Sequence, residues 1–426
     1  MTRSDIKKTL DYAGRNGLAA TIAAARERLA DERVPYRYDL PAAAELERQR
    51  RESGEWMKAG TAPLVSVVVP AWKPVREHFE AMRASVESQS YGNFELIISE
   101  EPGGISANTN AGIARASGAY IALLDHDDLL APDALYHLVK AVKAAEARGV
   151  RPLMVYSDED KIRTESEPLF FAPNRKPDFN YDYLLSNNYI CHLSMIDAAV
   201  LKQLKMNGEY DGSQDHELFL RLFAQAEPAG GPACADARFL HVPRVLYHWR
   251  SHKDSTAESG AHKSYAHEAG RRAVSSHLRS RGVNCAVQET AHRGFFRVQY
   301  FDDIFVSRPD IGAVGGKLTD RRGRMRGGLY TGKGEILFDG QPRGASGGFT
   351  HRAACQQDAE AVDCGNIIIR PKLLHSLSGE IRELLSEGCV NGMNREERIR
   401  ASINLCEKIR ERGYRILWDP LMEKRI

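Results

Sequence analysis

The sequence has few cysteines, and their arrangement suggests neither disulfide nor zinc chemistry. Its 426 residues include seven cysteines, and none of them forms a C-x-x-C pair. An odd number of scattered cysteines is atypical of a disulfide framework and favours reduced thiols in a cytosolic compartment. We therefore expect a protein that folds without disulfides.

Long apolar runs are absent as well. No stretch approaches the ~20 apolar residues that a transmembrane helix requires. The opening residues, MTRSDIKKTLDYAG, contain no apolar segment typical of a secretory signal. The sequence thus predicts no membrane span and a cytoplasmic location.

An excess of charge of one sign is also missing, because 59 basic residues face 57 acidic ones and the net charge is +2. Proteins that bind nucleic acid through a general basic surface are far more positive, so a nucleic-acid partner is not expected. No G-x-G-x-x-G follows the first apolar strand, which counts against a nicotinamide-dinucleotide fold. The G-x-x-x-x-G-K match ending at Lys333 continues with Gly334 in place of Ser or Thr, so an NTPase phosphate loop is not expected either.

The chain does contain an alternation of apolar strands and amphipathic helices. Residues 63–72, 94–99 and 120–124 have the continuous apolar pattern of buried strands, and helical patterns at 75–88 and 106–118 separate them. This order predicts a parallel α/β sheet, in which ligands bind beyond the carboxyl ends of the strands. Ahead of the sheet, Leu18, Ile22, Ala25 and Leu29 recur at helical spacing and predict amphipathic helices.

A cluster of acidic residues, DHDD, follows the strand at 120–124 directly. Three carboxylates within four residues repel one another unless a positive group neutralises them. Mg²⁺ and Mn²⁺ prefer oxygen ligands and often take only one or two protein carboxylates, so Asp125 and Asp127 are candidates to bridge a cation to a diphosphate. The alternative is a solvated loop that caps the next helix.

Three later segments contain further polar candidates. Asp215 lies in the first turn of the helix predicted at 212–223, where the helix dipole stabilises a carboxylate, and it is either a general base or a simple helix-end charge. His248 and His252 could form a zinc pair, but the chain has no H-E-x-x-H motif and no clear third ligand. The strand predicted at 153–162 contains Asp158 and Asp160, which are either a solvated strand end or a substrate contact.

Six segments, taken together and in this order, resemble family 2 of the inverting glycosyltransferases: VSVVVPAW, ISANTNAGIARASGAYIALLDHDDLLAPDAL, VYSDEDKI, LSNNYICHLSMID, GSQDHELFLRL and VPRVLYHWRSHKDSTA. The similarity is greatest to the bacterial cell-surface polysaccharide and O-antigen type, and it covers about Leu64 to Ser259. The resemblance implies a GT-A fold, with a Rossmann-like half that binds a nucleotide sugar and a half that binds the acceptor.

The resemblance also implies roles for individual residues. Pro70 and Ala71 match the loop beside the nucleoside base, and Asp125 would lie near the nucleoside and ribose. Asp127 matches the metal-binding carboxylate, with Asp128 supporting it.

In the later segments, Asp215 matches the general base of the family. His248, Trp249 and Arg250 match the segment that closes over the diphosphate, and His248 is also a candidate metal ligand. Acceptor contacts are expected from Asp158, Asp160 and Asn188.

The sequence departs from the family pattern at the turn that binds the nucleobase. The family usually has an Asp-rich turn after the second strand, whereas this chain reads SEEPGG, and Glu100 would substitute for the missing aspartate.

The last part of the chain resembles only the second half of a glycosyltransferase unit. RPDIGAVGGKLTDRRGRMRGGLYTG and GYRILWDP match the end of such a unit, but its first strands and its D-x-D are missing. Ala401 and Ser402 stand where acidic residues of a base motif are expected. We therefore divide the chain into an N-terminal helical segment (1–62), a GT-A domain (63–290) and a smaller, truncated α/β module without catalytic function (291–426).

The function expected from the resemblance is metal-dependent transfer of a sugar from a nucleotide donor to a hydroxyl of a glycan or lipid-linked glycan, with inversion, in surface polysaccharide synthesis. One alternative is a non-catalytic nucleotide- or carbohydrate-binding module, because the SEEPGG turn is short. Another is a sugar nucleotidyltransferase, which would also use a carboxylate-bound metal but needs no base like Asp215. A homodimer and peripheral contact with the inner face of the membrane are further expectations.

Overall fold

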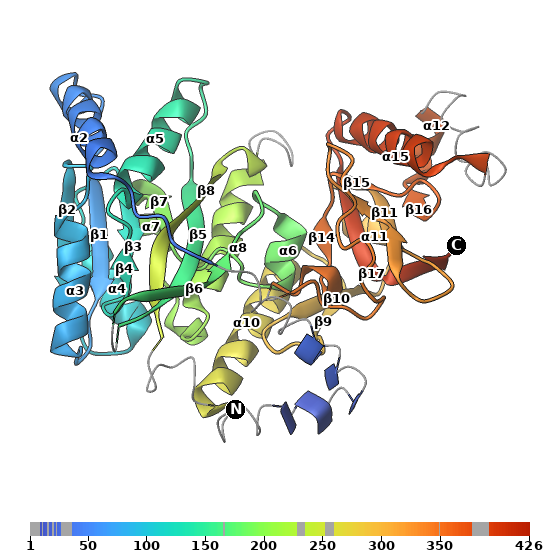
Figure 1. The fold of residues 1–426 in the computed structure, drawn as a ribbon, viewed down its shortest axis with the longest axis horizontal. Helices are drawn as coiled ribbons and strands as arrows, with labels where there is room; N and C mark the ends of the chain where they lie inside the picture. Colours follow the sequence, from blue (N-terminus) through green and yellow to red (C-terminus); the bar gives the residue numbers. More distant parts are fainter. Residues whose placement is uncertain are drawn as a thin grey trace. The chain divides into compact units, whose positions relative to one another are not determined.

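The computed structural model describes residues 36–164, 167–227, 235–251, 260–348, 350–376 and 392–426, together with scattered residues between 9 and 26. The chain divides into two compact units (Figure 1). The large unit comprises Pro35–Phe179 and Asn188–His277, and the small unit comprises Met1–Val34, Asn180–Asn187 and Leu278–Ile426. These limits differ from the sequence-based division at residues 62 and 290 in three ways: the expected N-terminal segment is divided between the units after Val34, the later boundary falls after His277, and residues 180–187 belong to the small unit.

The large unit is built on a sheet of strand order β2-β1-β3-β7-β5-β8-β4, with β6 paired to β5. Its strands are β1 (Val65–Pro70), β2 (Phe94–Ser99), β3 (Tyr120–Leu123), β4 (Leu129–Leu130), β5 (Met154–Arg163), β6 (Leu169–Asn174), β7 (Ser194–Asp197) and β8 (Phe239–Arg250). The helices of this unit are α2 (Ala43–Lys58), α3 (Arg76–Glu87), α4 (Ile105–Arg115), α5 (Ala134–Glu146), α7 (Ala198–Leu204), the short η1 (Gly208–Tyr210), α8 (Gln214–Ala226) and α10 (Gly260–Ser280), whose last residues fall in the small unit.

The predicted α/β class is confirmed, and so is the parallel pairing of the first three strands. β1 runs parallel to both β2 and β3, which brings the carboxyl ends of these strands to one edge. The later strands form a mixed continuation, because β7 pairs antiparallel with both β3 and β5. The apolar pattern of β7 shows that the strand is buried but carries no information about its direction.

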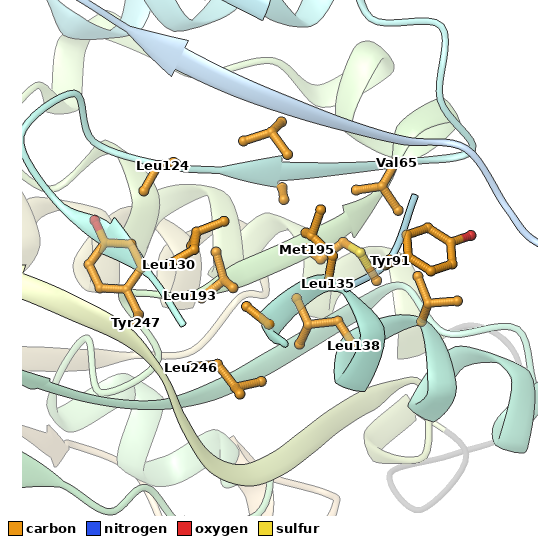
Figure 2. Close-up of a cluster of buried hydrophobic side chains, with 14 of the residues drawn as sticks. Val65, Tyr91, Leu124, Leu130, Leu135, Leu138, Leu193, Met195, Leu246 and Tyr247 are labelled. Atoms are coloured by element: carbon orange, nitrogen blue, oxygen red, sulfur yellow. The ribbon is translucent and has the colours of Figure 1, made fainter. Parts of the chain in front are cut away.

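The core of the large unit lies between this sheet and its helices. β1 contributes Val65, Val67 and Val69, all fully buried, because its nearly continuous β-branched residues suit a strand covered on both faces. Figure 2 shows side chains from β1, α5, β7 and β8 meeting in this cluster, with Met195 and Leu138 among them. This packing fixes the strands whose ends carry the polar residues described below.

The small unit contains a sheet of order β12-β11-β17-β14, with β16 paired to β11, and the two-stranded pairs β9–β10 and β13–β15. Its strands are β9 (Cys285–Glu289), β10 (Phe296–Tyr300), β11 (Ile311–Thr319), β12 (Met325–Gly327), β13 (Leu329–Tyr330), β14 (Gln357–Asp358), β15 (Ala361–Val362), β16 (Ile367–Ile369) and β17 (Arg415–Arg425). Its helices are α6 (Tyr181–Ser186), α11 (Ile304–Ser307), η3 (Arg352–Ala354), α12 (Pro371–Ser376) and α15 (Arg395–Arg410).

A buried ionic network holds α6 within the small unit. Arg308 is 1% exposed and donates from Nη1 and Nη2 to the two carboxylate oxygens of Asp182, at 2.7 and 3.1 Å. The same guanidinium also contacts Asp310, and Arg415 contacts Asp310 and Asp358. Buried charges are stable in this way only when they are paired and hydrogen-bonded.

The helix predicted in the first residues is only partly described. Leu18 and Ile22 are helical and largely exposed, while Leu29 lies outside the described residues. Within the described part of the chain, no helix is both long enough and apolar enough to cross a membrane.

Candidate active site

The DHDD segment forms the loop between β3 and β4, beyond the carboxyl end of β3. Asp128, at its end, is 1% exposed and accepts hydrogen bonds from the hydroxyl of Tyr247 at 2.5 Å and from the backbone N–H of Arg250 at 2.7 Å. Both donors belong to β8. Asp128 therefore anchors the acidic loop to β8, which agrees with a supporting role.

The other carboxylates of the loop influence one another electrostatically. The pKa of Asp125 is raised, first because the group is withdrawn from water and further because Asp127 and Asp215 repel its charge. His192 acts in the opposite direction, with Nε2 3.7 Å from Oδ2 of Asp125. Burial, followed by repulsion from Asp125 and Asp127, also raises the pKa of Asp128 well above its ordinary value. Burial and mutual repulsion thus both disfavour the charged forms of Asp125 and Asp128 at this edge.

Asp215 lies in the first turn of α8, as predicted, and its carboxylate is held by three contacts. Asn188 donates from Nδ2 to Oδ2 at 2.7 Å, and the backbone N–H of His216 donates to Oδ1 at 2.9 Å. The Sγ of Cys191 lies 3.6 Å from Oδ2. Glu217, two residues further on, instead pairs with Arg221 at 2.6 Å, so Asp215 is the carboxylate of this turn that faces the acidic loop.

Arg250 ends β8 against the same loop. It is 3% exposed and donates from Nε to the carbonyl of Asp127 at 2.6 Å and from Nη1 to Oγ1 of Thr164 at 2.5 Å. Its remaining nitrogen, Nη2, is buried and has no hydrogen-bond partner among the residues that the structure describes. Because an unpaired buried donor is costly, this N–H suits an anionic ligand atom such as a phosphate oxygen.

The segment predicted to lie beside a nucleoside base ends β1. Ala71 is fully buried, and its N–H donates to the carbonyl of Ser99 at 2.7 Å, which joins the ends of β1 and β2. Asn108 of α4 bridges the two loops: its Nδ2 donates to the carbonyl of Ala71 at 3.0 Å, and its Oδ1 accepts from the N–H of Glu101 at 2.9 Å. The carbonyl of Pro70 lies 3.3 Å from Nδ1 of His126 in the acidic loop. The three loops therefore form one connected edge.

The turn Ser99–Gly104 is stabilised by its glycines and by Asn108. Gly103 and Gly104 have φ of 109° and 97°, which favours glycine over other residues. Glu100 is exposed at this turn and free of the hydrogen bonds that fix Glu101, which leaves it accessible to a nucleotide. Trp249 is partly buried, and its ring lies 5.1 Å from Nζ of Lys161 and 6.3 Å from the ring of His192.

The structure places His248 away from the acidic cluster described above. Its Nδ1 lies 2.6 Å from Oδ1 of Asp160, and its ring packs against Tyr38 and Phe170 with centroid distances of 4.5 and 4.7 Å. This is the packing of a buried, hydrogen-bonded histidine, and a contribution of His248 to a metal site stays a prediction. His252, its proposed zinc partner, lies outside the described residues.

The carboxylates of the SDED segment are buried inside β5, which continues through them to Arg163. Asp158 is 1% exposed and bonded to His241 and to the N–H of Lys176, and Asp160 is 0% exposed and bonded to His248 and Tyr36. This corrects the expectation of a solvated strand end. It also favours structural roles over acceptor contacts for both residues, because their carboxylates are buried and already hydrogen-bonded within the protein.

Among the described residues, one group has the composition of a metal site: Asp125, Asp128 and His192 each offer a ligand atom within 4.8 Å of the others. Carboxylate oxygens with one imidazole suit Mn²⁺ and, less closely, Mg²⁺. Asp127 is adjacent but not part of this group. His192 was missed in the sequence because a single histidine in SNNYICHL follows no metal spacing.

The chain is similar to known proteins over part of its length. The family profile described as Glycosyl transferase family 2 matches residues 73–205, a span that includes the DHDD loop, Asn188 and His192. The uncharacterized protein y4gI of Sinorhizobium fredii is 36% identical over 248 residues, which are 51% of this chain and 25% of that protein. The O-antigen biosynthesis protein RfbC of Myxococcus xanthus is 27% identical over 267 residues, 56% of this chain and 20% of that protein.

Among solved structures, S. aureus TarS in complex with UDP-GlcNAc aligns with a TM-score of 0.37 and 11% identity over 50% of this chain and 66% of that one. The chain spans a quarter or less of the length of the two curated relatives named above. From the family match and the α/β structure of the large unit, we conclude that this chain carries a glycosyltransferase family 2 domain.

Proposed function

We propose that the chain is an inverting, metal-dependent glycosyltransferase that moves a sugar from a nucleotide donor to the hydroxyl of a glycan or lipid-linked glycan in bacterial surface polysaccharide synthesis. The observation that carries this proposal is the convergence of Asp125, Asp127 and Asp215 at the carboxyl end of β3, beside the unpaired Nη2 of Arg250. Such a site combines a place for a cation, a donor for a phosphate and a carboxylate base. The match to an O-antigen biosynthesis protein supports the polysaccharide context.

The base in this proposal is Asp215. Its Oδ2 accepts from Asn188, which orients the carboxylate while a lone pair remains for the acceptor proton. A carboxylate that removes this proton makes the hydroxyl a better nucleophile as it attacks the anomeric carbon from the face opposite the diphosphate. Asn188 also has a buried Oδ1 for which the described part of the chain supplies no partner, and this atom suits a hydroxyl of the acceptor.

The leaving diphosphate would be bound by two groups of this chain. The Nη2 of Arg250 offers a charge-assisted hydrogen bond that needs no new side-chain arrangement, since Nε and Nη1 already fix the guanidinium plane. The acidic loop would hold the divalent cation through Asp127, as the resemblance implies, or through Asp125 and His192. When bound there, Mn²⁺ or Mg²⁺ would supply Lewis-acid stabilisation of the phosphate charge.

Nucleoside binding would fall to the edge formed by Pro70, Ala71 and the Ser99–Gly104 turn. Asn108 and Ala71 tie this turn to β1, so the turn is held in place even though it is short. This observation favours a donor-binding enzyme over the non-catalytic binding module. The contacts that orient Asp215 favour glycosyl transfer over nucleotidyl transfer, which needs no such base.

The test is to incubate the protein with Mn²⁺ and a panel of UDP-, GDP-, dTDP- and CMP-sugars and to measure release of the nucleotide. We expect release of a nucleoside diphosphate from one class of donor, suppressed by EDTA and restored by Mn²⁺. Release of pyrophosphate from a nucleoside triphosphate and a sugar phosphate would favour the nucleotidyltransferase. Binding of a nucleotide with no turnover in the presence of polysaccharide acceptors would favour the binding module.

The small unit is proposed to be a non-catalytic module that supports acceptor binding or a homodimer. Asp419, the carboxylate in its WDP segment, is bonded to Arg297 and Gln356 and so is already engaged in the fold. Replacing Asp419 with Asn is expected to leave turnover unchanged. Loss of turnover with the fold preserved would show a working site in the small unit.

A further inference from the structure

A buried lysine of the large unit has no role in the chemistry proposed above. Lys176 follows β6, and its side chain is 0% exposed. Its ammonium makes three contacts: with Oε2 of Glu159 at 3.3 Å, with the carbonyl of Ile190 at 2.5 Å and with the carbonyl of His192. An ammonium has three N–H donors, so every donor is used.

The two carbonyls belong to the residues on either side of Cys191. That residue has φ of 38°, in the left-handed region that is unfavourable for a residue with a side chain. A loop that departs from the common backbone regions must be held by its surroundings. Lys176 supplies such a constraint. Glu159 holds its ammonium, and its backbone N–H donates to Asp158 at 2.9 Å.

The same loop provides the contacts that orient the proposed catalytic carboxylates. Asn188 donates to Asp215, Cys191 places Sγ beside Asp215, and His192 lies beside Asp125. Lys176 therefore contacts the backbone of a loop whose side chains reach both Asp215 and Asp125. It lies outside the loops at Ala71 and Glu101, which are tied to Asn108 instead.

We infer that Lys176 is a positioning residue, whose buried ammonium, held by Glu159, clamps the loop Asn188–His192 and thereby fixes the orientation of the base Asp215. This also gives two carboxylates of the SDED segment a structural role, because Asp158 and Glu159 hold Lys176 in place. The inference rests on the proposed function only for its catalytic consequence, because the clamping of the loop can be measured on the protein alone.

The test uses Lys176→Met, which keeps the aliphatic stem and removes all three donors. A matched control is Lys202→Met, because Lys202 of α7 also donates to a backbone carbonyl, that of Ala116, but not near the site. Pulse labelling with N-ethylmaleimide, resolved by peptide mass spectrometry, reports on each cysteine. In the wild type, Cys191 is partly buried and burial raises its thiol pKa, so slow labelling is expected.

In folded Lys176→Met, local release of the loop should raise the labelling rate of Cys191 about tenfold or more, while Cys355, Cys364 and Cys406 stay protected in their core. Turnover at saturating donor should fall by a similar factor, with the donor KM changed less than about threefold, since the donor loops are untouched. Lys202→Met should change neither quantity. If Lys176 were only structural, its replacement would lower thermal stability without reducing kcat more than it changes KM.

Three outcomes would each overturn the inference. They are labelling of Cys191 at the wild-type rate, an unchanged kcat, and faster labelling of the buried cysteines in parallel with Cys191. If Lys176→Met fails to fold, Glu159→Gln keeps an acceptor of the same shape for the ammonium and should show the same effects at smaller size. If the wild type turns over no nucleotide sugar, the proposed function fails, and the labelling comparison still decides whether Lys176 holds the loop.

Discussion

Replacing Asp215 with Asn tests the base directly, because the structure predicts a large loss of turnover with little loss of stability. The amide occupies the same volume as the carboxylate but cannot accept a proton at neutral pH. General-base catalysis typically contributes ~10²–10⁴-fold, which corresponds to an increase of about 3–5 kcal/mol in the activation free energy.

Stability should survive because the neighbours of Asp215 can adapt to the amide. Its oxygen can still accept from the N–H of His216, but its NH₂ would then face the NH₂ of Asn188. A flip of the Asn188 amide would present Oδ1 instead, an atom that is buried and has no partner in the wild type. The exchange replaces one hydrogen bond with another, so we expect a change in unfolding free energy below about 1 kcal/mol.

The assay measures nucleoside diphosphate release under saturating donor and acceptor, alongside donor affinity by calorimetry. Turnover of Asp215→Asn should fall at least a hundredfold, with donor affinity unchanged, because the base acts on the acceptor proton. Glu217→Gln is the matched control: it lies in the same turn of α8, but its carboxylate is paired with Arg221. A variant of Asp215 that keeps more than about a tenth of the wild-type rate would refute the assignment of the base.

Three further predictions concern the cation, the buried ions and pH. Asp127→Asn should abolish Mn²⁺-dependent binding of a nucleoside diphosphate, because the amide lacks the charge that attracts a dication; unchanged affinity in calorimetry would shift the cation to Asp125 and His192. Arg308→Met should cost roughly 3–5 kcal/mol of unfolding free energy by leaving buried carboxylates unpaired, whereas Arg83→Met, at an exposed pair with Glu87, should leave the denaturation midpoint almost unchanged in the same experiment. Burial, with repulsion from Asp358 and Asp310, raises the pKa of Asp182 to about 7. Because the folded protein holds this proton more tightly than the unfolded chain, the stabilisation present at low pH is lost as pH rises through about 7. Asp182→Asn should therefore show a flatter melting temperature between pH 5 and 8 than the wild type, and parallel curves would contradict the assignment.

Much of the fold was predictable because its signals are local in sequence. The β-branched run at β1 and the apolar run at β2 were placed within two residues of their ends, since continuous apolar segments bounded by polar residues leave few alternatives. The position of DHDD beyond β3 followed from the same pattern. The place of Asp215 in the first turn of a helix was predictable from capping and spacing, whereas its role as a base came from the family resemblance and stays a proposal.

The parts that were missed depend on contacts between distant segments. β5 continues through SDED because His241, His248 and Tyr36 supply hydrogen-bond partners for its carboxylates. Partners so distant along the chain cannot be predicted from the local sequence pattern. His192 joins the acidic cluster only because β7 runs antiparallel beside β3, which brings the loop before β7 to the carboxyl end of β3. The direction of one short strand thus decided which histidine lies at the site.

Hydrogen bonds from neighbouring elements explain how one edge of the sheet can hold several carboxylates. Asp128 is stabilised by two donors of β8, and Asp215 by the amide of Asn188, so each of these carboxylates is paired within the protein. Asp125 has His192 and His126 nearby, which favour its charged form, while Asp127 and Asp215 oppose its ionisation. Asp125 and Asp127 likewise repel the charge of Asp128, and a divalent cation bound at this loop would relieve the repulsion. A ligand that binds only the folded state stabilises it. The repulsion between these carboxylates therefore lowers the stability of the protein without a cation and raises its affinity for one.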